Sequence, residues 1–309
     1  MIKLEKITVG IPRAFLYYRY KELWLNYFGN LDIDIVVSPE TDKRILELGQ
    51  KYSVDESCIS SKIFLGHIAY LVSKCDYILV PRISDYGNNE KTCVKFNALY
   101  DIVRNLFPDQ KILGYNIEKT KYNIELLAFI KIGHQLNKKI LSILRAYEMA
   151  KEEEIAFNLR QMANQDELLN SDRLKILIVA HPYNIYDKYI GEPIQKILNN
   201  LDVELLYADK IDRKIAKKYA KTYSQTLYWT YSKELIGAIG YYHDYIDGII
   251  FVTAFPCGPD SLVNELLIRK LKDIPITNIL INESTAEAGL QTRLESFIDI
   301  IKGKKEQND

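Results

Sequence analysis

The sequence predicts an α/β protein of two lobes, each built on a parallel sheet, joined by a helical bridge. Three observations predict this fold. Short β-branched runs alternate with segments of helical length in both the first and the last third of the chain, as in Rossmann-like sheets. The middle third carries apolar residues at helical spacing and no strand signal. A chain of 309 residues is also long for one domain and comfortable for two.

The first lobe, residues 1–120, is expected to alternate strands and helices. Gly49 is expected to stop one helix, because glycine often follows a helix C-terminus. Pro81 is expected to end the third strand, because proline cannot donate to a ladder. The predicted strands are 4–10, 33–37, 77–81 and 111–115, and the predicted helices are 14–28, 42–48, 63–74 and 96–107.

The helical bridge, residues 121–172, has no strand signal and is expected to be one long helix or a helical pair. The second lobe, residues 173–309, resumes the alternation. Its predicted strands are 174–180, 203–207, 248–252 and 276–281, and its predicted helices lie in 193–201, 208–242, 260–272 and 290–302. Two lobes of similar size suggest an old duplication, although no clean sequence repeat is visible.

The composition argues against several classes of partner. Lysine plus arginine equals aspartate plus glutamate, at 41 each, so nucleic acid is not expected to bind. The basic run 210–221 alternates with apolar residues and is typical of a solvated helix face. No run reaches the ~18–20 apolar residues that a membrane span needs, and no leader pattern stands at the N-terminus. We therefore expect a cytoplasmic protein whose four cysteines are thiols or metal ligands.

Three cysteines lie in loops where a parallel sheet would place a site. Cys257 follows the strand 248–252, in a segment that its prolines and Gly258 exclude from helix or strand. Cys93 follows the loop after the third strand, and Cys58 precedes a helix. Ligands bind outside the carboxyl ends of parallel strands, so we expect these three thiolates to converge on one metal site.

Buried reduced thiols remain the alternative, because free cysteine is among the most buried residue types. Cys75, at a helix–strand joint, fits that alternative better than a ligand role. No C-x-x-C pair is present, so a zinc knuckle is not supported. Three thiolates on a [4Fe–4S] cluster would leave one iron for a substrate oxygen, or for an oxygen ligand from Glu56, Ser60 or Ser61.

Several motifs together resemble the 2-hydroxyacyl-CoA dehydratase superfamily, and more narrowly its activase-related, benzoyl-CoA reductase-like branch in a stand-alone form. The resemblance covers nearly the whole chain. It is carried by Val9-Gly10-Ile11-Pro12-Arg13-Ala14-Phe15, Glu56-Ser57-Cys58, Gly66-His67, Pro81-Arg82, Cys93-Val94-Lys95, His181-Pro182-Tyr183 and Phe255-Pro256-Cys257-Gly258-Pro259-Asp260.

The resemblance implies cysteine-ligated [4Fe–4S] or double-cubane clusters between Rossmann-like lobes. It also implies an ATP-hydrolysing activase as partner, which injects a low-potential electron to form a ketyl radical on a 2-hydroxyacyl-CoA. This chain departs from the branch at Ser60 and Val94, where prolines are usual, and at Asn282-Glu283, where an Asp-Glu pair is usual. These departures leave cluster binding as the firmer expectation and the substrate open.

Other candidate residues flank these loops. His67 and Glu283 are candidate catalytic residues for proton transfer, and His181 is a candidate for a supporting role beside the site. Arg13, Arg82 and Lys62 are candidate cofactor-binding residues for a carboxylate or a CoA phosphate. For each of these residues a structural role, as an ion pair or a cap, stays open.

Three hypotheses follow. The protein is an enzyme component for radical or reductive chemistry on an acyl-CoA or a small substrate, that is, a dehydratase-like lyase or a reductase. Alternatively, it is an electron-transfer or accessory subunit, or a cluster-free protein that binds a small molecule. No phosphate-binding glycine motif is present, so ATP chemistry would come from the activase, and a homodimer or heterodimer is compatible with the sequence.

Overall fold

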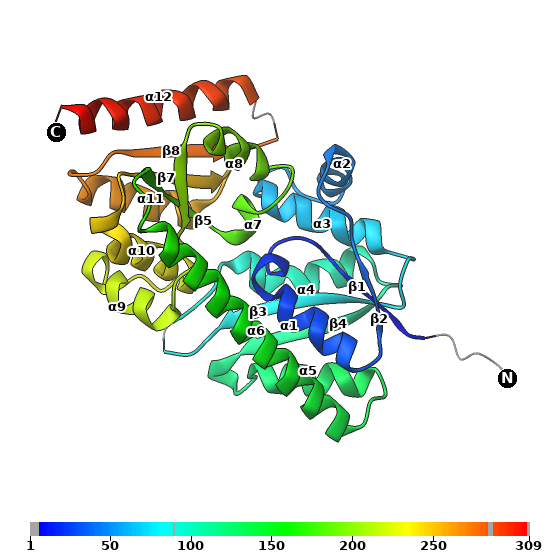
Figure 1. Cartoon of the computed structure of the whole chain (residues 1–309). Helices are drawn as coiled ribbons and strands as arrows, with labels where there is room; N and C mark the ends of the chain where they lie inside the picture. Colours follow the sequence, from blue (N-terminus) through cyan, green and yellow to red (C-terminus); the bar gives the residue numbers. More distant parts are fainter. Residues whose placement is uncertain (1–5, 89, 284–286, 308–309) are drawn as a thin grey trace. The chain divides into compact units, whose positions relative to one another are not determined.

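The computed structural model confirms the predicted fold class: the chain forms two four-stranded parallel sheets with helices between the strands (Figure 1). It describes residues 6–88, 90–283 and 287–307. The chain divides into two compact units, residues 1–158 and 159–309. The predicted bounds of a separate bridge, 121–172, stay a prediction.

The first unit contains the sheet with strand order β2-β1-β3-β4. The order reverses direction between β1 and β3, so right-handed crossovers place α1 on one face and α2 to α4 on the other. Its elements are β1 (Thr8–Ile11), α1 (Tyr17–Asn30), β2 (Asp34–Val37), α2 (Lys43–Lys51), α3 (Ile59–Leu71), β3 (Tyr77–Asp85), α4 (Val94–Leu106), β4 (Lys111–Glu118), η1 (Lys119–Lys121) and α5 (Glu125–Gln135).

The second unit repeats the same order as β6-β5-β7-β8. The helix α6 (Ile140–Leu168) follows α5 and crosses from the first unit into the second, so the strand-free middle of the chain is a helical pair, one of the two predicted alternatives. The remaining elements are β5 (Leu174–Ala180), α7 (Pro182–Ile185), α8 (Glu192–Asn199), β6 (Val203–Tyr207), α9 (Arg213–Tyr223), α10 (Thr230–Tyr242), η2 (His243–Tyr245), β7 (Gly248–Ala254), α11 (Gly258–Lys270), β8 (Ile276–Ile281) and α12 (Glu287–Glu306).

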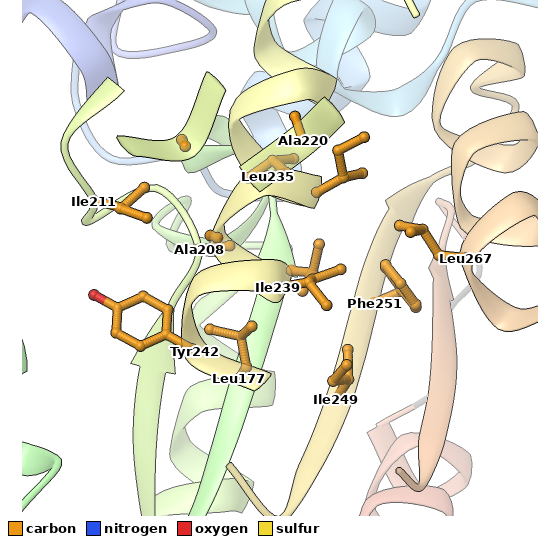
Figure 2. Packing of buried hydrophobic residues seen from close by; sticks show 14 of the residues in the cluster. Leu177, Ala208, Ile211, Ala220, Leu235, Ile239, Tyr242, Ile249, Phe251 and Leu267 are labelled. Atoms are coloured by element: carbon orange, nitrogen blue, oxygen red, sulfur yellow. The ribbon is translucent and has the colours of Figure 1, made fainter. Parts of the chain in front are cut away.

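The core of the second unit lies between the sheet and the helices that cover it. Figure 2 shows Leu177 from β5 and Ile249 and Phe251 from β7 meeting Leu235 and Ile239 from α10. All five side chains are buried. The apolar runs that predicted β5 and β7 therefore mark the strands around which this unit packs.

The two sheets share one register. Val9 of β1 pairs with Tyr77, the first residue of β3, and Ile176 of β5 pairs with Gly248, the first residue of β7. An aspartate directly before the third strand holds each first strand. Asp76 accepts a 2.7 Å hydrogen bond from the Thr8 backbone N–H, and Asp247 accepts one of 2.8 Å from that of Lys175. Positions in the two units can therefore be matched one to one along these strands.

The prediction that Gly49 stops a helix was wrong. The helix α2 continues to Lys51, and Gly49 instead lets α2 lie against the backbone of α3. A Cβ atom at Gly49 would lie 1.8 Å from the Lys62 carbonyl oxygen, and one at Gly66 would lie 2.0 Å from that of Ile45. Glycine here serves close helix packing instead of a helix end.

The prediction that Pro81 ends the third strand was also wrong, because β3 runs through it to Asp85. The strand β1 pairs with β3 only at Tyr77 and Ile78, whereas β4 accompanies β3 along its length. Beyond Ile78 one side of β3 therefore has no strand partner, and a proline can sit there without removing a ladder hydrogen bond. The predicted helical stretch 208–242 is likewise two helices, α9 and α10, with Asp212 capping α9.

Close packing of α2 on α3 makes Gly66 a position that no larger residue fits. We expect Gly66→Ala to lower the free energy of unfolding by about 1–3 kcal/mol, because the added methyl group must push the two backbones apart. The matched control is Gly29→Ala in α1, where a Cβ atom meets nothing within 4 Å; it should raise stability by about 0.5–1 kcal/mol. Urea denaturation measures both, and equal effects of the two substitutions would contradict the packing role.

Candidate functional site

Cys58 and Cys93 occupy the same position on two neighbouring helices of the first unit. Cys58 is the N-cap of α3, with φ −60° and ψ 149°. Cys93 is the N-cap of α4, with φ −60° and ψ 144°. Their carbonyl oxygens accept the first helical hydrogen bonds, from Ser61 at 2.9 Å and from Phe96 at 3.0 Å. Each cysteine therefore stands at the positive end of a helix dipole, which favours a thiolate.

Two contacts hold these helix ends together. Lys95, in the first turn of α4, donates a 3.2 Å hydrogen bond from Nζ to Oγ of Ser57, the residue before Cys58. The buried Phe15 ring, in the loop after β1, lies 5.5 Å from the Phe64 ring and 5.0 Å from the Phe96 ring between centroids. Phe15 adopts φ 47°, a left-handed conformation that is rare for a bulky residue. The structure thus brings two of the three predicted ligands to adjacent helix ends.

The loops that carry these cysteines are held by buried polar groups. Lys62, a predicted cofactor-binding residue, is buried and donates to the Asp55 carbonyl oxygen at 2.9 Å, which closes the loop before Cys58. Asp85 accepts hydrogen bonds from the backbone of Gly87 at 2.9 Å and of Thr120 at 3.0 Å, which orders the loop before Cys93. Burial opposes ionisation of Asp85, but hydrogen bonds from the Thr120 hydroxyl and from these two backbone groups outweigh it and lower the pKa of the carboxyl.

The structure places both predicted arginines in polar contacts with neighbouring elements. Arg13 donates from its backbone to Ser38 Oγ at 2.8 Å, and its guanidinium lies 3.6 Å from Glu40. Arg82 lies 3.5 Å from Asp101 of α4. These contacts match the structural alternative for the two arginines, and their role toward a cofactor stays a prediction.

His67, a predicted catalytic residue, is fully buried on α3. Its Nε2 lies 3.0 Å from Thr41 Oγ1, and within the described ranges its Nδ1 has no hydrogen-bond partner. Burial lowers the pKa of the imidazole to about 3, with the positive charge of Arg13 acting in the same direction. His67 is therefore uncharged near neutral pH, and any proton-transfer role would use the neutral ring.

In the second unit Cys257 is the N-cap of α11, so it matches the position of Cys93 on α4. Asp260, in the first turn of α11, lies 2.9 Å from Nε2 of His181, the residue directly after β5. The His181 and Asp260 side chains are 7% and 10% exposed. Burial opposes ionisation of Asp260, but His181 and a hydrogen bond from Cys257 outweigh it and lower the pKa of the carboxyl. This pair fastens the Cys257 turn to the sheet.

A small cavity of ≈ 10 Å³ lies beside the His181–Asp260 pair. Its polar lining comes from His181, Ser232, Asp260 and Asn264, and its apolar lining comes from strands and helices of the same unit. Asn264 donates a 2.7 Å hydrogen bond to Thr253 Oγ1. The ring of His181 also stacks on Tyr183, with centroids 5.0 Å apart.

Sequence reasoning gave Asp260 and Asn264 no role of their own. Asp260 stands three residues after Cys257, the spacing at which an acidic residue contributes to a helix N-terminus, so that signal was available. Asn264 lies one turn further along α11 and has no comparable signal. Its relation to the end of β5 arises only from folding.

The remaining predicted site residue, Glu283, lies just beyond β8 and is partly buried; the three residues that follow it lie outside the described part of the chain. Within that described part no group of three or more His, Cys, Asp or Glu side chains could hold a metal ion. The predicted ligands are divided between units, with Cys58 and Cys93 in the first and Cys257 in the second. The cysteine site stays a prediction.

Across residues 6–88, 90–283 and 287–307, no helix is both long enough and apolar enough to cross a membrane.

The family model described as CoA enzyme activase uncharacterised domain (DUF2229) matches residues 8–211, about two thirds of the chain. No curated protein matches. Solved structures with some likeness include Streptococcus pneumoniae AdcAII, at 8% identity and TM-score 0.31, covering 96% of this chain and 98% of that one.

Two others are a Mn-bound periplasmic metal binding protein from Candidatus Liberibacter asiaticus and the laminin-binding adhesin Lmb from Streptococcus agalactiae. The first has 12% identity and TM-score 0.28, covering 95% of this chain and 99% of its own. The second has 10% identity and TM-score 0.29, covering 94% and 97%. At these TM-scores the likeness carries no argument about fold or function.

Burial of His67 predicts a pH-dependent stability. The unfolded chain binds a proton near the ordinary pKa of 6.5, whereas the folded chain binds it only near about 3. Acid therefore favours unfolding. As the pH falls from 6.5 to about 3, His67 should lower the free energy of unfolding by up to roughly 5 kcal/mol. Urea denaturation at about pH 7 and about pH 4.5 should show a smaller loss of stability in His67→Gln than in the wild type.

The control is His134→Gln, which changes an exposed histidine on α5. It should leave the pH dependence as in the wild type. An unchanged pH dependence in His67→Gln would contradict the buried, uncharged state of this ring.

Proposed function

The chain belongs to the family of CoA enzyme activase uncharacterised domains, and from that premise we propose that it is an iron–sulfur protein. Its Cys58, Cys93 and Cys257 would hold a [4Fe–4S] cluster. It would receive low-potential electrons from an ATP-dependent activase, for radical or reductive chemistry on an acyl-CoA or a small substrate.

The observation that supports this proposal is the shared position of the three thiols. All three cysteines are helix N-caps in extended backbone, and none uses its sulfur to cap its own helix. Ser, Thr, Asp and Asn are the usual N-caps, because their oxygen accepts a helical N–H. Three cysteines in this position are poor caps, but each sulfur stands at a positive helix end that suits a thiolate ligand. The donor set thus fits iron–sulfur ligation.

When bound, such a cluster supplies one-electron redox chemistry, with a Lewis-acidic iron wherever a protein ligand is lacking. The chain's own residues would position the ligands. The hydrogen bond from Lys95 to Ser57 fixes the spacing of the Cys58 and Cys93 turns. The His181–Asp260 pair fixes the Cys257 turn. Supporting hydrogen bonds of this kind commonly hold metal ligands in orientation.

Cys75 provides a matched comparison within the same chain. It lies between α3 and β3, with its Sγ 3.6 Å from the Leu71 carbonyl oxygen. Burial raises the pKa of its thiol to about 11, which disfavours the thiolate that metals bind. Cys75 is also not a helix N-cap, so it lacks the feature that the three proposed ligands share.

Anaerobic reconstitution with iron and sulfide tests the proposal. The wild type should take up about four iron and four sulfide per chain. Cys58→Ala, Cys93→Ala and Cys257→Ala should each lose most of that iron, because each removes one ligand, whereas Cys75→Ala should retain it. Iron and sulfide assays with the visible absorption spectrum give the readout.

Iron near zero in the reconstituted wild type would contradict cluster binding itself. Iron unaffected by Cys257→Ala would contradict the assigned ligands. Loss of iron in Cys75→Ala equal to that in the other three variants would show that the assay reports general damage to the fold. Circular dichroism of each variant separates that outcome from ligand loss.

A further inference from the structure

The equal strand order and register of the two units let each position near the end of one sheet be compared with its counterpart in the other. Counted from their N-caps, Ser61 of α3 corresponds to Ser232 of α10, and Phe96 of α4 corresponds to Asp260 of α11. The shared register aligns Val9 with Ile176, so Ala14 corresponds to His181. By the same count, Tyr100 corresponds to Asn264.

At this place the two units differ in chemistry. The first unit fills it with aromatic rings, because Phe15 packs between Phe64 and Phe96. The second unit places the buried pair His181 and Asp260 there. Of the four positions that give the second unit its polar cavity lining, only the serine has a small polar counterpart in the first.

The first unit acts as an internal control for stability. Buried polar side chains are costly to desolvate, and apolar residues of the same shape often replace a hydrogen-bonded pair of them without loss of stability. In the first unit, phenylalanine rings pack at the end of a sheet of the same strand order. The fold therefore does not require the polar lining of the second unit. Fixing the Cys257 turn accounts for His181 and Asp260, whereas the additional polar lining from Ser232 and Asn264 points to a ligand.

The location agrees with ligand binding. His181 follows β5 directly, and Asp260 follows β7 by one loop and the first turn of α11. The order β6-β5-β7-β8 reverses between β5 and β7, and ligands of open parallel sheets bind at such a reversal, beyond the carboxyl ends of the strands.

We propose that His181, Ser232, Asp260 and Asn264 form a subsite for the hydroxyl group of a small ligand. The cavity of ≈ 10 Å³ admits about one oxygen atom, so the rest of the ligand lies outside it. The carboxylate and amide oxygens accept, and the amide and hydroxyl groups donate, so a hydroxyl group can both donate and accept there.

This subsite does not rest on the proposed cluster, because none of its four residues is a predicted ligand. It is tested in protein purified without iron. The probes are propan-2-ol and acetone, which share a shape but differ in the hydrogen-bond donor. The readout is the Cε1 resonance of His181 in histidine-labelled protein, which has four histidines and is assigned with His181→Gln.

Propan-2-ol should shift the His181 resonance in a saturable manner, and acetone should bind about tenfold more weakly, because it leaves the acceptor unpaired. Ser232→Ala and Asn264→Leu should each weaken the binding of propan-2-ol by a similar factor of about ten. The matched control is Ser61→Ala, the counterpart in the first unit, which is equally buried and should leave the affinity unchanged.

The absence of a saturable His181 shift would overturn the proposal. So would equal affinities in Ser232→Ala and wild type, or an equal loss in Ser61→Ala. If Asn264→Leu does not fold, as judged by the dispersion of the four resonances, Ser232→Ala against Ser61→Ala still decides the question.

Discussion

Hydrogen bonds from the first strand of each unit to an aspartate determine which residues reach the end of each sheet. Asp76 and Asp247 stand directly before β3 and β7 and accept from the backbones of Thr8 and Lys175. They thereby set the register between the first and third strands. A slip of one residue would turn every side chain of a strand to the other face. The placement of Phe15 and Cys93, and of His181 and Cys257, depends on that register.

The two units share one register, but different residues lie at the carboxyl ends of their strands. The first unit closes around Phe15 and places two cysteines on helix ends joined by the Lys95–Ser57 hydrogen bond. The second unit places one cysteine beside a buried His–Asp pair. A single architecture can therefore place cysteines at helix N-caps in both units and a buried His–Asp pair in one, which is consistent with function residing in sites and not in the fold.

The sequence was sufficient to predict the strands of both sheets, because β-branched runs such as 174–180 and 248–252 indicate buried parallel strands without long-range information. It failed where packing decided the outcome. Gly49 follows the local rule for a helix end, but the approach of α3 overrides that rule. Pro81 follows the rule for a strand end, but one side of β3 has no partner there. Similarly, the cysteine loops were predictable, whereas the contact of His181 with Asp260 spans 79 residues and appears only in the fold.

Differential alkylation tests whether Cys58, Cys93 and Cys257 are ligands of one cluster. Cluster-loaded and cluster-free protein are treated anaerobically with iodoacetamide, and the labelling of each cysteine is measured by mass spectrometry. If they are, the cluster protects these three cysteines together and leaves the labelling of Cys75 unchanged. Equal labelling of Cys257 in the two forms would contradict this assignment.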